Sequence, residues 1–68
     1  MSVYKVIELV GTSEVSGEDA AKNAIETARH TIHDLRVGEV TKFDLKVENG
    51  RLLYRTRLNL SFKYLGNK

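Results

Sequence analysis

The chain has 68 residues, of which 41% are hydrophobic and 29% charged, and its formal net charge is +2. This composition indicates one small globular domain over residues 1–68 and excludes a disordered or membrane-spanning chain. Because the sequence has no cysteine and only two histidines, disulfides and thiolate metal sites are excluded. A domain of this size buries only ~60% of its unfolded surface, so we expect self-association to supply the missing stability.

The positive charge is mild, with a pI of about 9.1. A nucleic-acid-binding domain of this size usually carries a larger excess of lysine and arginine, so we expect a small anionic ligand and no nucleic acid. The first residues, Met1 to Lys5, lead into a strand-like stretch and not into the apolar segment of a signal peptide. We therefore expect a cytoplasmic protein with no membrane partner.

Residues 2–10 predict a strand, because they are rich in β-branched side chains and contain no breaker. Both of its faces are mostly apolar, whereas a strand buried on one side alternates cleanly. We therefore expect a partner subunit to cover its second face. A helix is predicted over residues 17–34, with Ser16 as N-cap and Asp19 in the capping-box position. Its apolar stripe comprises Ala21, Ala24, Ile25, Ala28, Ile32 and Leu35.

Two further strands are predicted over residues 37–47 and 51–65, joined by a tight hairpin at Asn49 and Gly50. Gly38 suggests a bend or bulge near the start of the first of these strands. The helix favours a right-handed crossover between parallel strands, so the last strand lies in the middle and pairs antiparallel with both others. The predicted fold class is α+β, with β-α-β-β order and a three-stranded antiparallel sheet packed on one helix.

Arg55 and Arg57 fall two residues apart on the sheet face away from the helix. They could bind a phosphate or carboxylate group, or form ion pairs with Glu8, Glu14 or Glu39 of a neighbouring subunit. We favour the ion pairs, because arginine is enriched at interfaces. Glu39 is expected on the apolar face of its strand, where it could contact a ligand or cation; a neighbouring arginine is the favoured partner.

Two acidic groups raise the question of a metal. The first group lies on the predicted helix and comprises Glu26, His30, His33 and Asp34; it could bind a divalent metal, but we favour a solvent-exposed helix face. The second group surrounds the helix start and comprises Glu14, Glu18 and Asp19. Acidic groups there interact favourably with the helix dipole, but at a symmetry axis several copies could instead gather around Ca²⁺. No nucleophile–base arrangement or phosphate loop is present in the sequence, so an enzyme is not expected.

Four stretches resemble the dodecins, a family of small flavin-binding proteins that assemble as hollow dodecamers. They are residues 4–13 (YKVIELVGTS), residues 28–35 (ARHTIHDL), the Glu39-Val40 pair and residues 54–63 (YRTRLNLSFK). Together they span nearly the whole chain in the expected order. The resemblance implies a homo-dodecamer of this fold, with FMN or riboflavin as the family ligand.

Two positions depart from the flavin-binding pattern. The tryptophan that stacks on the flavin ring is Val37 here, and the glutamine that bonds the polar edge of the ring is Arg55. Arg36 adjoins the stacking position without occupying it. Stacking on an aromatic side chain contributes ~1–3 kcal/mol per ring, so losing two symmetry-related rings weakens binding by roughly two orders of magnitude.

The sequence therefore predicts a non-enzymatic, dodecameric, dodecin-like binding or storage protein with weak flavin binding. The ligand-site candidates are Val37, Arg55, Arg36, Glu39 and Arg57. The alternative is a flavin-independent structural or calcium-binding dodecamer. A nucleic-acid module is disfavoured, because no aromatic side chains are interleaved with the arginines.

Overall fold

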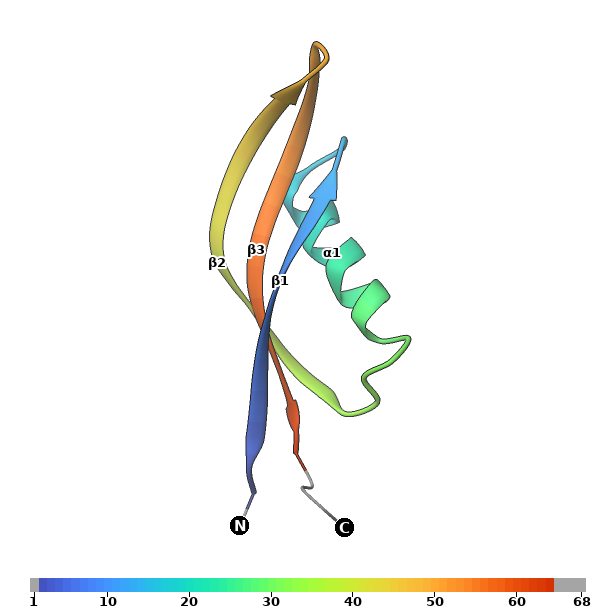
Figure 1. Ribbon diagram of the computed structural model, residues 1–68, viewed down its shortest axis with the longest axis vertical. Coiled ribbons are helices and arrows are strands. Elements are labelled where there is room, and N and C mark those ends of the chain that lie inside the picture. The colour runs from blue at the N-terminus through green and yellow to red at the C-terminus, as the bar shows by residue number, and fades with distance from the viewer. Residues whose placement is uncertain (1, 65–68) are drawn as a thin grey trace.

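The computed structural model describes residues 2–64. Its elements are β1 (Tyr4–Ser13), α1 (Gly17–Ala28), β2 (Leu35–Glu48) and β3 (Arg51–Lys63). The sheet order is β1-β3-β2, and β3 pairs antiparallel with both neighbours. α1 packs over β1 and β3 and scarcely touches β2 (Figure 1). The predicted α+β fold is thus confirmed. Within residues 2–64, no helix has the length and apolar character needed to cross a membrane.

The start of α1 is fixed by side chains of the loop before it. Ser16 is the N-cap, and its hydroxyl accepts a hydrogen bond from the backbone N–H of Asp19 at 2.9 Å. The carboxylate of Asp19 accepts a 2.6 Å hydrogen bond from the buried hydroxyl of Ser13, the last residue of β1. β1 begins two residues later than the predicted strand and ends three residues later, because its pairing with β3 continues to Ser13 opposite Tyr54.

α1 ends at Ala28, so the prediction of a helix to Asp34 is wrong. The β-branched Thr31 and Ile32 are weak helix formers, and the chain turns so that β2 can begin at Leu35. The backbone N–H of Lys63 donates to the carbonyl of Asp34 at 3.2 Å, which fastens this turn to the sheet. Ile32 and Leu35 still pack against the core, but from the turn and from β2.

Small residues let α1 lie close to the sheet. Ala24 and Ala28 form the buried core with Leu58 and Leu60 of β3. At Gly11 in β1, an added Cβ would lie 3.0 Å from the Cβ of Ala24 and closer still to the helix backbone. Only a glycine permits this approach, so this position sets the distance between α1 and the sheet.

The hairpin between β2 and β3 turns at Asn49 and Gly50, whose φ values are +53° and +74°, as predicted. β2 carries two register irregularities, between Leu35 and Val37 and between Val40 and Lys42. They lie on either side of Gly38 rather than at it. β3 ends at Lys63, and the predicted end of this strand at Leu65 lies outside the described residues.

The second bulge overturns the expected position of Glu39. Pairing places Glu39 opposite Asn59 and Phe43 opposite Thr56, and successive residues of β3 point to opposite faces. Thr41 is the extra residue of the bulge, so it reverses the alternation. Phe43 therefore faces the helix side of the sheet, whereas Glu39 lies on the opposite side.

Candidate functional site

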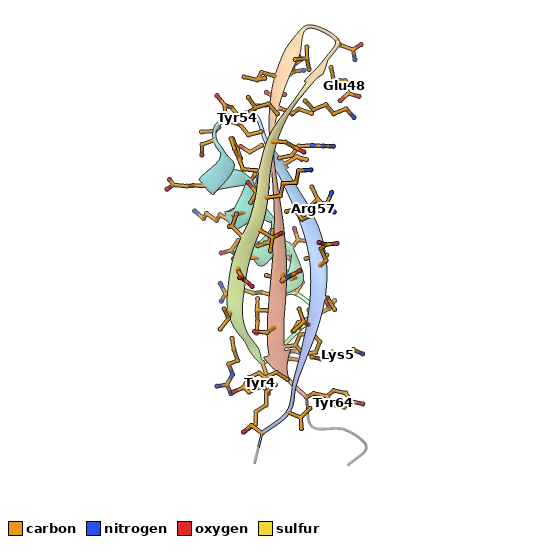
Figure 2. The ribbon with its side chains drawn as sticks, turned by 90° about the vertical axis from the view of Figure 1, so that its left-hand side faces the viewer. Tyr4, Lys5, Glu48, Tyr54, Arg57 and Tyr64 are labelled. Atoms are coloured by element: carbon orange, nitrogen blue, oxygen red, sulfur yellow. The ribbon has the colours of Figure 1, made fainter. Side chains whose placement is uncertain are left out.

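The sheet face opposite α1, called the open face here, holds all but one of the candidate ligand residues. The strand registers place side chains from all three strands on this face. Figure 2 shows Arg57 at the middle of the sheet and Glu48 near the hairpin end. The open face includes Val6, Glu8 and Val10 of β1, Val37, Glu39, Lys42, Asp44, Lys46 and Glu48 of β2, and Leu53, Arg55, Arg57, Asn59 and Ser61 of β3.

Arg55 is held by a carboxylate of its own chain. Its Nε and Nη2 atoms donate to the two carboxylate oxygens of Asp44 at 2.7 and 2.8 Å, across the β2–β3 ladder. These hydrogen bonds are the main reason that the pKa of Asp44 lies below its usual 3.8, although partial burial opposes them. The same pair raises the pKa of Arg55. The bidentate geometry occupies the edge of the guanidinium best suited to an anionic ligand.

Sequence reasoning missed Asp44, although the signal was present. A two-residue hairpin fixes the register of its strands, and counting outward from Asn49 and Gly50 places Asp44 opposite Arg55. The expected partners of Arg55 were glutamates of a neighbouring subunit. Within the described chain its partner is this cross-strand aspartate.

The neighbouring positions leave positive charge on the open face. Lys42 lies directly opposite Arg57, and like charges facing each other across a ladder are unfavourable. Arg57 forms an ion pair with Glu8, with 3.6 Å between Nη1 and Oε1. Lys42, Arg55, Arg57, Asp44 and Glu8 together carry a net charge of +1 at the middle of the sheet, which would attract an anionic group locally. Glu39 and Glu48 add negative charge to the same face on either side of this cluster.

Val37 and its neighbours form a separate end of the open face. Val37 lies opposite Ser61 and is 57% exposed. Ser61 is six residues from Arg55 along β3, a separation of ~20 Å at ~3.4 Å per residue. One protomer therefore does not bring Val37 and Arg55 to the same small ligand. Arg36 lies in the first bulge, with its Nη2 atom 3.8 Å from Asp34.

The acidic residues at the helix start have separate tasks in one protomer. Glu14 forms an ion pair with Arg51, and Asp19 accepts from Ser13. Glu18 is exposed. Across residues 2–64, no three His, Cys, Asp or Glu side chains come together as a metal site.

The second acidic group is divided by the early end of α1. Glu26 remains on the helix, where it accepts from Arg29 at 3.4 Å. His30, His33 and Asp34 lie in the turn after Ala28, so the expected continuous helix face through these residues does not exist. The prediction that His30 and His33 lie on this helix is therefore wrong.

One helix packed on a three-stranded antiparallel sheet in β-α-β-β order, with a charged open face, defines a class of small α+β proteins. The dodecin family model matches residues 3–65, and the chain belongs to the dodecin family. It is 47% identical over 64 residues to calcium dodecin from Mycobacterium tuberculosis (strain ATCC 25618 / H37Rv), covering 93% of this chain and 90% of that protein.

Solved dodecin structures share the fold. A crystal structure of the M. tuberculosis protein, described as a calcium-chelating antigen with a novel calcium-binding site, has a TM-score of 0.86 and 43% identity over 98% of this chain and 97% of that one. Dodecin from Streptomyces coelicolor has a TM-score of 0.89 and 31% identity, over 97% and 96% of the two chains. A T. thermophilus dodecin mutant has a TM-score of 0.88 and 32% identity, over 98% and 100%.

Proposed function

We propose that this protein is a non-enzymatic, homo-oligomeric binding protein, assembled as a dodecamer. The observation that carries the oligomer is the surface of one chain. Its accessible area is 5185 Å², whereas a compact monomer of this mass exposes about 4,300 Å². The excess is similar to the ~800 Å² that each partner buries in a standard interface.

The shape and the exposed side chains support the same proposal. The radius of gyration is 13.8 Å, against about 11 Å for a compact chain of this length. Val6 and Val10, on the open face of β1, are 58% and 49% exposed. Light scattering after size exclusion should give the mass of about twelve chains at micromolar concentration. A folded monomer at that concentration would overturn the proposal.

Flavin is the poorer candidate for the ligand. Val37 offers no stacking surface, and Arg55 is committed to Asp44. A guanidinium also only donates hydrogen bonds, where an amide both donates and accepts. Titration of FMN and riboflavin, followed by quenching of flavin fluorescence, should give weak binding by the unmodified protein. Tight quenching would contradict this part of the proposal.

Calcium is the better supported ligand, because the M. tuberculosis relative that is 47% identical is named calcium dodecin. One protomer gathers no metal site within residues 2–64, so we propose that carboxylates from several copies meet around the ion. Glu14, Glu18 and Asp19 are the candidates, since Ca²⁺ takes six to eight oxygen ligands. Symmetry would supply each carboxylate more than once.

Calorimetric titration of the assembled, chelator-treated protein with Ca²⁺ tests this assignment. Glu18→Gln should weaken calcium binding without loss of fold, because Glu18 is exposed and makes no capping bond. Glu26→Gln is the matched control on the same helix and should bind calcium like the parent. If Glu18→Gln binds calcium as tightly as Glu26→Gln, the calcium site is not at the helix start.

A further inference from the structure

One row of residues across the open face brings two cationic side chains together. Arg57 of β3 is paired with Val10 of β1 on one side and with Lys42 of β2 on the other, and it lies at the middle of the sheet (Figure 2). Lys42 and Arg57 are both exposed. Directly opposed residues of an antiparallel pair have Cα atoms only ~4.5–5.5 Å apart, so the two cationic groups can reach one small group in front of the sheet.

The bulge at Thr41 brings Lys42 into this row. Without the extra residue, the alternation that includes Glu39 would place Thr41 on the open face and Lys42 on the helix side. The hydroxyl of Thr41 donates to the backbone carbonyl of Arg57 at 3.3 Å, so the bulge is fastened at the row itself. A lysine directly opposite an arginine destabilises a ladder, and within residues 2–64 Lys42 has no carboxylate partner within 4.0 Å.

The carboxylates of the open face offset this charge only in part. Both oxygens of Asp44 accept hydrogen bonds from Arg55. Glu8 reaches Arg57 from the β1 side, at 3.6 Å. Glu39 lies two residues further along the β3 ladder, a distance of ~7 Å, and forms no ion pair within 4.0 Å in the described part of the chain. The row therefore holds two like charges that share one carboxylate, Glu8.

A small hollow opens at this row. It has a volume of about 30 Å³ and is lined by Val10, Lys42, Asp44, Arg55 and Arg57. Three of the five lining residues are cationic, and the carboxylate among them is engaged by Arg55. The volume is about that of one water molecule in the liquid, so the hollow admits one oxygen of an oxyanion whose other oxygens stay at the mouth.

We infer that Lys42 and Arg57 bind a phosphate group on the open face. An ammonium offers three donors and a guanidinium five, and charge-assisted hydrogen bonds are roughly twice as strong as neutral ones. A phosphate group carries a charge of about −1.5 to −2 at pH 7, so it replaces the repulsion between two cations by two attractions. The inference is independent of the calcium assignment, because neither residue belongs to the helix start.

Phosphate binding by the assembled, chelator-treated protein tests the site. Calorimetric titration with inorganic phosphate is compared with chloride at the same ionic strength, which separates binding from screening. Lys42→Gln should weaken phosphate binding by roughly 10- to 150-fold, the loss expected for one hydrogen bond to a charged group, whereas Lys42→Arg should retain it. Lys46→Gln is the matched control, since it removes the same charge from the same strand and face opposite the neutral Leu53.

A second titration, with glycerol 3-phosphate, identifies the source of the phosphate group. Tighter binding than that of inorganic phosphate would assign the site to an organic phosphate monoester, and weaker binding would assign it to the free ion. In both cases Lys42→Gln should reduce the affinity and Lys46→Gln should not.

Stability without phosphate gives an independent readout. At low salt, Lys42→Gln should raise the urea midpoint because it removes the like charge opposite Arg57, and Lys46→Gln should leave the midpoint unchanged. A parent protein that does not bind phosphate, or a Lys42→Gln variant that binds it as tightly as Lys46→Gln, would show the inference to be wrong. A lower midpoint for Lys42→Gln would mean that a carboxylate of a neighbouring copy already pairs with Lys42, which equally excludes the phosphate. None of these results alters the calcium titration, so the two proposals fail separately.

Discussion

Val37→Trp should raise flavin affinity, because it supplies the aromatic surface that this chain lacks. Val37 is 57% exposed and lies on the open face, so the larger indole displaces no core residue. Stacking contributes ~1–3 kcal/mol per ring, which converts to a roughly 5- to 150-fold tighter dissociation constant. The gain is larger if two symmetry-related indoles enclose the ligand.

Restoring the glutamine of the flavin-binding pattern at position 55 requires a second substitution at Asp44. Arg55→Gln alone would leave Asp44 without its bidentate partner, so it is combined with Asp44→Asn. Val37 and Arg55 lie ~20 Å apart in one protomer, and changes that far apart are additive. Coupling of more than about 0.5 kcal/mol between the two changes would therefore mean that residues of different copies touch one ligand.

The assay is FMN fluorescence quenching by the parent, Val37→Trp, Arg55→Gln/Asp44→Asn and the combined variant, with the mass of each checked by light scattering. Val15→Trp is the control, since it adds an indole at an exposed valine in the loop between β1 and α1, away from the open face. An assembled Val37→Trp protein that quenches no better than Val15→Trp would refute the stacking position.

Three further predictions concern stability. Gly11→Ala should destabilise each protomer by about 1–3 kcal/mol through overpacking against α1, seen as a lower midpoint of thermal unfolding by circular dichroism. Gly38→Ala should cost less, because its Cβ meets only side-chain methyl groups at 3.1 and 3.2 Å; equal losses would contradict the close approach at Gly11. Ser16→Ala should lower the free energy of unfolding, measured with urea, by about 0.5–2 kcal/mol, because it removes the N-cap. An unchanged urea midpoint would show that the Ser16 side chain does not stabilise the helix. The pKa of Asp44 is lowered from its usual 3.8 in the folded protein, so its ionised carboxylate stabilises the fold at pH values above 3.8. This stabilisation is lost as the pH falls through the lower pKa of the folded state. Asp44→Asn should therefore lose less stability than the parent between about pH 5 and pH 3, and parallel pH curves would show that the pair contributes nothing.

The elements with strong local signals were predictable from the sequence. Long alternation identified β3, and Asn49 with Gly50 marked the hairpin, because both residues tolerate positive φ. Ser16 was identified as the N-cap from residue type and position alone. These features depend on contacts between near neighbours in the chain, which the sequence records directly.

The features that failed depend on distant parts of the chain. α1 stops at Ala28 because the following turn is fastened to Lys63 of β3, and helical periodicity contains no information about that contact. The face of Glu39 depends on the unpaired Thr41, and a bulge is visible only in the pairing with β3.

The bulge at Thr41 also has a consequence for how this sequence can diverge. One unpaired residue shifts the phase of all side chains on one side of it, so deleting Thr41 would exchange Glu39 and Val40 between the two faces. A single deletion would then alter the charge of the open face and the lining of the apolar groove between α1 and β2 together. Length changes in β2 are therefore a more powerful route to a new ligand or a new assembly than substitutions at either face.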